Sequence, residues 1–161
     1  MATSVDQPGE AAPLSVGRSP GRQPYAELHV VSNYSFLRGA SHPEELVEQA
    51  AKLGYLAIAI TDECSFAGLA KSHMAASDHD IRLIVGAEFY LEEGIHLVLL
   101  APDRAAYGQL AGLISKLRRR SPKGEYHMSL EDLNWGIDGC LGLWVPGLTE
   151  IGTLILSLIH I

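Results

Sequence analysis

The sequence predicts an α/β fold in which buried strands alternate with amphipathic helices, and three observations support this. Two short apolar runs, 28–31 and 56–60, flank a segment with helical periodicity, which is the pattern of a β-α-β unit. Two further apolar runs follow at 82–90 and 95–101. At 161 residues, with 47% hydrophobic and 19% charged residues, the chain has an ordinary globular composition and the length for one domain with a core.

The segment between the first two apolar runs carries the start and stop signals of a helix. Ser41 has the position of an N-cap, with Glu44 three residues on at capping-box spacing and Pro43 in the first turn. Gly54 follows the last turn, where a left-handed residue commonly ends a helix. We therefore expect a helix between the first two strands.

The unit then repeats with variation. Residues 66–77 are predicted to form a second helix. The strands at 82–90 and 95–101 are predicted to pair as a hairpin, because only a Glu-Glu-Gly turn separates them.

A third helix and a final strand complete the predicted elements. Asp103 is placed to cap the helix, which finishes in Arg118-Arg119-Arg120. The apolar face of this helix is predicted to consist of Tyr107, Leu110, Ile114 and Leu117. Ser129 is placed to cap a short turn, and the run 141–145 predicts a further strand closed by Pro-Gly.

The chain divides into three parts. Residues 1–24 contain four prolines, three glycines and almost no large apolar side chain, so we expect a flexible extension. Residues 25–150 carry the predicted elements. Residues 151–161 are almost wholly apolar but too short for a bilayer, which needs about 20 residues, and 156–161 resembles the translation of a sequencing-library end. We expect this tail to be non-native or frame-shifted, with a natural core strand as the alternative.

Composition excludes several classes of protein. The net charge of -7 argues against a stand-alone nucleic-acid binder, which needs a basic surface. Two cysteines, Cys64 and Cys140, are too few for a disulfide framework and suit a reducing compartment. The N-terminus shows no apolar run of a signal peptide. These features predict a cytoplasmic protein with no membrane association.

Four potential metal ligands follow or close three consecutive predicted strands. His29 lies on the first strand, Asp62 and Glu63 follow the second, and Glu88 lies near the end of the third. Imidazole and carboxylate donors suit zinc or manganese, and such an ion could activate water against a phosphate ester. Each residue also has an ordinary structural explanation: a core histidine, a helix cap or turn residue, or a strand-end charge.

Several segments strongly resemble the polymerase and histidinol phosphatase (PHP) domain at the start of bacterial C-family DNA polymerases, the relatives of the polymerase III alpha subunit. The sequence of these segments is most similar to the error-prone branch of that family. The resemblance covers about residues 25–147 and implies an incomplete, distorted (β/α) barrel of the PHP type. The segments that carry it are 27–43, 59–65, 83–89, 96–101 and 139–146.

The resemblance also implies a degenerate metal site. Where metal-binding members of the family have His-x-His, this chain has Val31 in place of the second histidine. Where they have Thr-Asp-His, it has Glu63 in place of the histidine. His29, Asp62 and Glu88 match, so the resemblance implies a vestigial or weakened zinc or manganese site at His29, Asp62, Glu63 and Glu88, without the fully occupied trinuclear cluster.

For the intact protein, the resemblance implies a DNA-directed DNA polymerase, a nucleotidyltransferase active in damage-induced mutagenesis and translesion synthesis. It implies a magnesium-binding palm, fingers and a β-clamp-binding region downstream, with DNA and accessory proteins as partners. This fragment would then be a structural domain without polymerase activity and without catalytic residues of its own. Because a half-barrel exposes unpaired strand edges, we expect it to be aggregation-prone.

Two alternatives stay open. The first is a metal-dependent phosphoesterase or 3′–5′ exonuclease of the PHP family, favoured by donors at neighbouring strand ends. The second is a free-standing phosphoesterase such as a histidinol phosphatase. The polymerase-like sequence of residues 34–43 argues against it.

The remaining candidate residues have structural interpretations. His96 alternates with apolar neighbours on its strand, so we expect a structural role. Cys64 is expected to be a buried small residue. Arg118, Arg119 and Arg120 could contact DNA phosphates, although basic residues are also favoured in the last turn of a helix. Surface positions are predicted for His42, His73 and His79.

Overall fold

The computed structural model describes residues 24–147. The predictions for the N-terminal extension and for the tail 151–161 therefore lie outside the described residues, apart from Pro24. Within the described range the chain is a mixed α/β structure, as predicted.

Between residues 24 and 147, five strands form one curled sheet, and their order in the sheet is their order in the chain. The strands are β1 (Ala26–Val30), β2 (Ala57–Ile60), β3 (Arg82–Tyr90), β4 (His96–Ala101) and β5 (Leu141–Val145). The pairs β1·β2 and β2·β3 are parallel, whereas β3·β4 and β4·β5 are antiparallel. The predicted hairpin between the third and fourth strands is confirmed.

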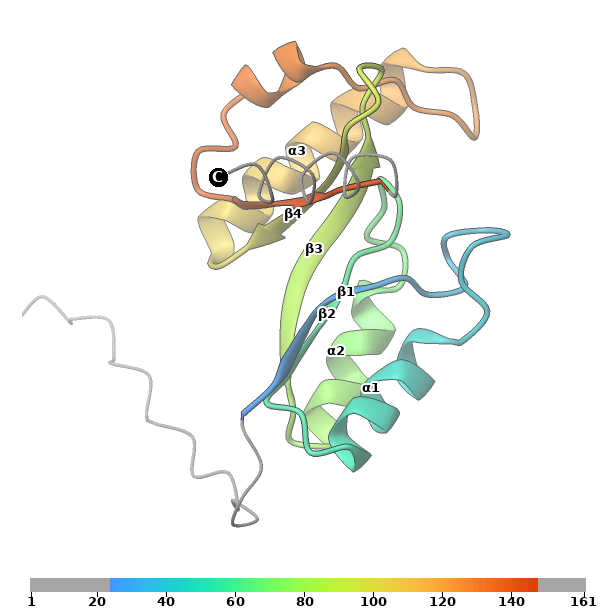
Figure 1. The fold of residues 1–161 in the computed structure, drawn as a ribbon, viewed down its shortest axis with the longest axis vertical. Coiled ribbons are helices and arrows are strands. Elements are labelled where there is room, and N and C mark those ends of the chain that lie inside the picture. The colour runs from blue at the N-terminus through green and yellow to red at the C-terminus, as the bar shows by residue number, and fades with distance from the viewer. Residues whose placement is uncertain (1–23, 148–161) are drawn as a thin grey trace, which may run out of the picture.

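Strand β3 joins the two halves of the molecule (Figure 1). Its first part, 82–85, pairs with β2, and its second part, 85–90, pairs with β4. Because the strand exchanges neighbours along its length, the sheet curls into a half-barrel, the incomplete barrel that the sequence predicts. Glu88 lies in the second part of β3, beyond the end of β2, where Glu63 forms an isolated bridge with it.

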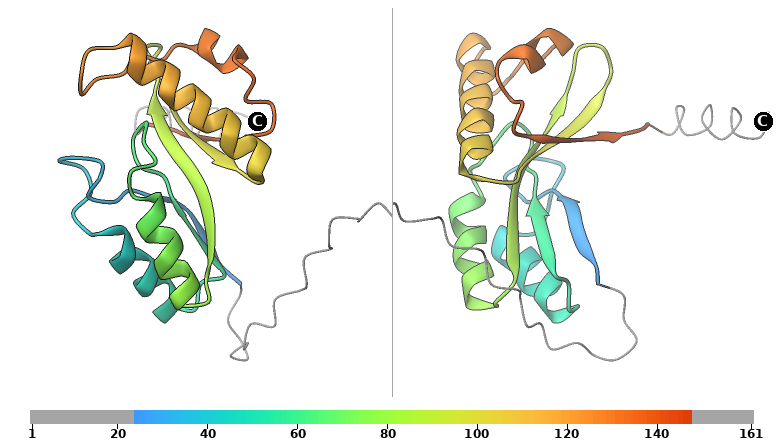
Figure 2. Two further views of the ribbon diagram at one scale, coloured as in Figure 1. Left: turned by 180° about the vertical axis from the view of Figure 1, so that it is seen from behind. Right: turned by 90° about the vertical axis from the view of Figure 1, so that its left-hand side faces the viewer.

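Each half has its own apolar core. In the parallel half, α1 (Pro43–Lys52) and α2 (Leu69–Asp78) cover the sheet, and their core includes Val47, Ile58, Ile60, Ala76 and Ile81. In the antiparallel half, α3 (Arg104–Arg120) and the short 3-10 helix η1 (Leu130–Asn134) enclose Phe89, Leu110, Leu113, Leu117 and Met128. Figure 2 shows α2 and α3 on the same side of the sheet.

The start of α1 differs from the prediction by one residue. The N-cap is His42, and its backbone N–H donates to Glu45 Oε2 at 2.9 Å, so the capping box is not the one predicted from Ser41 and Glu44. The Ser41 carbonyl instead accepts from the Asn33 backbone N–H at 2.9 Å, which ties it to the preceding loop. Gly54 has φ +73° and ends the helix as predicted.

The later elements follow the sequence with small shifts. Helix α2 begins at Leu69 rather than residue 66. Asp103 caps α3 as predicted, accepting from the Ala106 N–H at 2.8 Å, and Ser129 is the N-cap of η1. The buried face of α3 is rotated slightly from the predicted one: it consists of Ala106, Leu110, Leu113 and Leu117. Tyr107 is half-exposed, and its ring stacks on Phe66, which packs against this core.

Candidate metal centre

The loop that follows β1 is held by the buried carboxylate of Asp62. Asp62 Oδ1 accepts from the Ser32 backbone N–H and from Ser35 Oγ, both at 2.8 Å, and Oδ2 accepts from Ser32 Oγ at 2.7 Å. All of these donors are neutral and belong to one loop. Asp62 is therefore engaged as the anchor of the loop, and the structure does not bring it into one group with His29 and Glu88.

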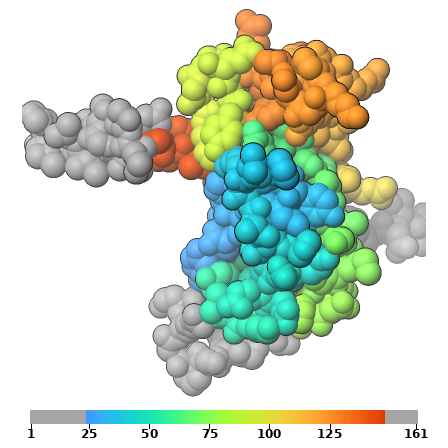
Figure 3. Space-filling view, turned by 90° about the vertical axis from the view of Figure 1, so that its right-hand side faces the viewer, coloured from blue at the N-terminus to red at the C-terminus, as the bar shows by residue number. Residues whose placement is uncertain are grey.

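A glycine is required where this loop closes. A Cβ on Gly39 would lie 2.0 Å from the Ser32 carbonyl oxygen and 2.9 Å from that of Val31. These atoms are backbone and cannot turn away, so a larger residue would push the two ends of the loop apart. In Figure 3 this part of the chain, coloured blue to cyan, lies at the surface below the orange segment near residue 125.

Glu88 is the centre of a second cluster, drawn from three strands and the loop. Its side chain is fully buried, and Oε2 lies 2.8 Å from His29 Nε2 on β1 and 2.9 Å from His96 Nε2 on β4. One ligand atom from each of these three residues lies within 4.8 Å of the others. His29, Glu88 and His96 therefore form a group that could hold one metal ion.

The other oxygen of Glu88 is occupied by a cation from the loop. Arg38 Nη1 donates to Glu88 Oε1 and, at 3.0 Å, to Glu63 Oε2. The Arg38 guanidinium carbon also lies 4.9 Å from the centroid of the Tyr90 ring, a cation–π distance. Arg38 thus bridges two carboxylates and rests on an aromatic face.

Glu63 lies on the open side of the cluster. Its side chain is 29% exposed and accepts from Arg38 and from the Tyr126 hydroxyl, the latter at 3.1 Å. Its backbone N–H donates to Ser35 Oγ at 2.9 Å. The structure therefore brings Glu63 and Glu88 together through Arg38.

The ionisation of the cluster follows from these contacts. Burial is the largest single influence on Glu88 and raises its pKa, but hydrogen bonds from His29, Arg38 and His96 together outweigh it and leave the pKa below its ordinary value. Burial raises the pKa of the Tyr126 hydroxyl. Glu88 is consequently a carboxylate stabilised by its donors, and Tyr126 is a neutral donor to Glu63.

His96 is the member of the cluster that the sequence analysis assigned a purely structural role. In the β3·β4 hairpin, His96 pairs with Tyr90 and Val98 pairs with Glu88, so His96 and Glu88 share a face as diagonal neighbours. The His96 ring stacks on Tyr90 at a centroid distance of 4.2 Å. The proximity of His96 to Glu88 could have been predicted by pairing the residues of the two strands outward from the hairpin turn.

The three arginines at the end of α3 differ in their surroundings. Arg118 donates to the backbone carbonyls of Glu63 at 3.0 Å and Cys64 at 3.1 Å, and so ties α3 to the end of β2. Arg120 Nη1 donates to Asp132 Oδ1 at 2.7 Å. Arg119 is exposed. Two of the three predicted phosphate contacts thus make intramolecular bonds in this structure.

The remaining candidates are not members of the group that could hold a metal ion. Cys64 is buried as predicted, and burial raises the pKa of its thiol to about 11. The surface positions predicted for His42, His73 and His79 are confirmed.

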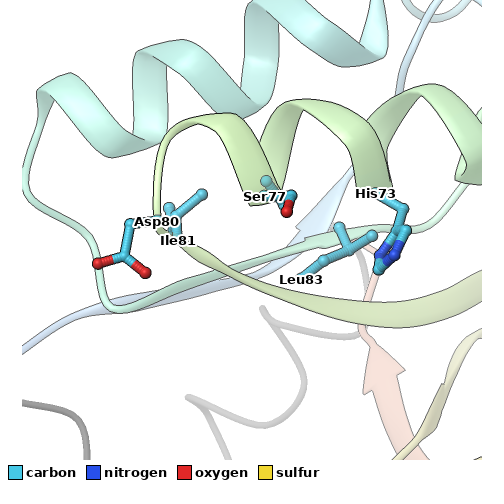
Figure 4. A pocket seen from close by; sticks show the side chains of 6 residues that line it. His73, Ser77, Asp80, Ile81 and Leu83 are labelled. Atoms are coloured by element: carbon cyan, nitrogen blue, oxygen red, sulfur yellow. The ribbon is translucent and has the colours of Figure 1, made fainter.

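A cavity of about 300 Å³ opens where α2 runs into β3 (Figure 4). It is lined by His73, Ala76, Ser77, Asp80, Ile81 and Leu83. This is the amino end of β3, whereas Glu88 lies near its carboxyl end. In open α/β sheets ligands gather at the carboxyl ends of the strands, so the Glu88 cluster is the stronger candidate site.

The comparisons with known proteins identify the fold as that of a PHP domain. The family model described as "PHP domain" matches residues 27–145, and the chain belongs to this family. It is 54% identical over 122 residues to an error-prone DNA polymerase of Teredinibacter turnerae and 51% identical over 122 residues to one of Saccharophagus degradans. Each match covers 76% of this chain but only 12% of the relative.

Solved structures agree with the family. A protein from Bifidobacterium adolescentis described as a metal-dependent phosphoesterase aligns with a TM-score of 0.50 and 25% identity, over 61% of this chain and 34% of that one. An amidohydrolase from Chromobacterium violaceum aligns with a TM-score of 0.55 and 21% identity, over 82% and 72% of the two chains, and this second likeness bears on the fold alone. Within residues 24–147, none of the helices has the length and apolarity to cross a bilayer.

Proposed function

We propose that this chain is the N-terminal PHP domain of an error-prone DNA polymerase, and that it serves there as a structural domain. The observation that carries the proposal is the identity of more than half over 122 residues to the Teredinibacter turnerae polymerase. The intact protein would be a DNA-directed DNA polymerase in damage-induced mutagenesis and translesion synthesis, acting on DNA in the cytoplasm.

The chain covers only a small part of the length of its relatives, and this bears on which part of the polymerase would carry out nucleotide addition. Because the chain spans 12% of the polymerases that it matches, template-directed nucleotide addition would depend on the remaining length. A magnesium-binding palm and a β-clamp-binding region would lie there, along with contacts to accessory proteins. The PHP domain would brace that assembly through its fold and carry no catalytic residue for polymerisation.

The contacts of the candidate ligands favour a structural role. Asp62 is engaged by three donors from the loop, and Arg38 lies between Glu63 and Glu88. Val31 offers no donor at the place of the family's second histidine. Each change removes or occupies a position that a multinuclear metal cluster would need.

The test starts from the gene. Resequencing the source DNA across codon 150 should reveal an open frame of several hundred further codons, and the full-length product should extend a primer on damaged and undamaged templates. The 161-residue chain alone should give no extension. A genuine stop codon after Ile161 in the source DNA would contradict the proposal.

The second candidate function is a metal-dependent phosphoesterase or 3′–5′ exonuclease. It is favoured by His29, Glu88 and His96, whose ligand atoms fit a single ion. Two imidazoles and a carboxylate suit zinc or manganese, and a bound ion would activate water for attack on a phosphate ester. Arg38 would hold Glu88 through its other oxygen.

This candidate is tested on the purified chain with zinc or manganese added. Release of nitrophenol from bis(p-nitrophenyl) phosphate and of nucleotides from single-stranded DNA would be measured for wild type, His96→Ala and the surface control His79→Ala. A structural domain should give equal background rates for all three proteins. Activity lost only in His96→Ala would establish the phosphoesterase instead.

A further inference from the structure

We propose that Arg38 is a resident cation that takes the place of a divalent metal ion at the Glu63/Glu88 carboxylate pair, so that the two carboxylates are held together and the centre is folded without metal. The inference deepens the structural role proposed above and rests on it. It concerns a residue of the loop, which supplies the positive charge shared by these two carboxylates.

The position of Arg38 is built from several sides. Its Nη1 donates to the fully buried Glu88 and to Glu63 Oε2 at 3.0 Å, and its guanidinium lies against the Tyr90 ring at 4.9 Å. Its side chain is 33% exposed. A guanidinium with two carboxylate partners and an aromatic wall is held as a specific group, unlike a solvated surface arginine.

The loop is folded so that it delivers this side chain. The backbone N–H groups of Arg38 and Gly39 both donate to the Ser35 carbonyl at 3.0 Å, and Ser35 Oγ donates to Asp62. Leu37 adopts φ +64°, an unusual conformation for a leucine, which lets the chain reverse directly before Arg38. The Asp62 anchor therefore aims Arg38 at Glu88.

Charge counting explains why an ion would compete with Arg38. Glu63 and Glu88 carry two negative charges, and Arg38 leaves one of them in excess. A divalent ion added beside Arg38 would reverse the sign of the cluster and would lie near a like charge in a partly buried position. Without Arg38, the same ion would neutralise both carboxylates.

The donors left after removal of Arg38 suit one ion. His29 and His96 present Nε2 atoms to Glu88 Oε2 at 2.8 and 2.9 Å, and Glu63 would gain a free oxygen. A change at position 38 should therefore convert a weak metal site into a stronger one.

The experiment compares zinc and manganese binding by the full 161-residue chain, after chelator treatment, with binding by Arg38→Gln, Arg38→Lys and Arg119→Gln. Arg38→Lys keeps the charge, and Arg119→Gln makes the same change at an exposed arginine of α3. Affinity is read by competition with a chromophoric chelator, and the unfolding temperature is read by circular dichroism with and without metal.

We expect Arg38→Gln to bind zinc at least tenfold more tightly than wild type, Arg38→Lys and Arg119→Gln. We also expect its unfolding temperature to be lowered without metal and restored by zinc, whereas wild type should respond neither to zinc nor to chelator. The zinc gain should disappear in Arg38→Gln/His96→Ala, which removes a donor.

The inference is overturned if Arg38→Gln binds zinc no more tightly than wild type, or if it fails to fold and zinc does not rescue it. It is equally overturned if chelator destabilises the wild-type chain. None of these readouts involves nucleotide addition, so failure here leaves the polymerase assignment to be decided by its own test.

Discussion

Asp62 and Glu88 are two buried carboxylates at the ends of neighbouring strands, and they are satisfied in opposite ways. Asp62 accepts only from neutral groups, a backbone amide and two hydroxyls of one loop. Glu88 accepts from a guanidinium and lies between two imidazoles, which come from the loop and from two strands. The first carboxylate fixes local backbone, and the second gathers charge from distant parts of the chain.

The difference teaches that matching a family's ligand pattern does not fix a residue's role. The sequence analysis assigned both residues to one metal site, and both are almost inaccessible to solvent. Only the chemistry of their partners separates an anchor from a charged centre.

The largest effect is expected from Asp62→Ala, which breaks the anchor. It would leave a backbone N–H and two hydroxyls without their acceptor in a buried place, and each such loss costs about 1–3 kcal/mol. We expect the free energy of unfolding to fall by about 4 kcal/mol in urea titrations. A loss below about 1 kcal/mol would show that the loop does not depend on Asp62.

A slightly smaller effect is expected from Gly39→Ala, which attacks the same loop through its backbone. The added methyl would meet the Ser32 carbonyl, and forced overpacking of this kind costs up to about 3 kcal/mol. Gly108→Ala is the matched control, because its Cβ would meet nothing within 4 Å and alanine is favoured over glycine in a helix. Equal stabilities of the two variants would contradict the expected clash.

The comparison itself is sharpened by two substitutions that preserve shape. Glu88→Gln should cost about 2 kcal/mol because Arg38 loses a charged partner, although the partial exposure of Arg38 and its bond to Glu63 limit the loss. Asp62→Asn should cost about 1 kcal/mol, since its donors are neutral and Ser32 Oγ can turn to accept. Urea titrations of both variants that gave the reverse order would refute the assignment of roles.

The smallest effect concerns Asp132, another buried carboxylate paired with a cation. Hydrogen bonding to Arg120 is the main reason why the Asp132 pKa lies below its ordinary value of 3.8. A lowered carboxyl pKa stabilises the fold above the ordinary value, and that contribution is lost as the pH falls below it. Unfolding measured between roughly pH 5 and pH 3 should therefore be less acid-sensitive in Asp132→Asn. An unchanged pH profile would indicate that the Arg120 pair contributes nothing measurable.

Much of the fold could be predicted because its strands are nearly continuous apolar runs. The strands at 82–90 and 141–145 have the predicted bounds, and the fold class follows from the alternation of strands and helices. The error at the start of α1 arose because the Ser41 carbonyl is engaged by Asn33, a contact that local capping rules do not include.

The site was less predictable because its decisive contacts span long stretches of sequence. The alternation around His96 predicts which face it occupies, but not that Glu88 lies diagonally across the hairpin. Arg38 was missed because a search for metal ligands considers donors of electron pairs and ignores a cation. Its direction depends on a turn at Leu37 that is fixed by Asp62, more than twenty residues further on.

The identical order of strands in the sheet and in the chain has a kinetic consequence. Each strand pairs with the strand made just before it, so no strand has to pair with a partner from beyond its neighbour in the chain, which keeps contact order lower than a crossed strand order would. On a ribosome the sheet can grow strand by strand as the chain emerges. His29 and Arg38 are synthesised before their partner Glu88. The charged centre can therefore form only after β3 and β4 have been synthesised and have paired.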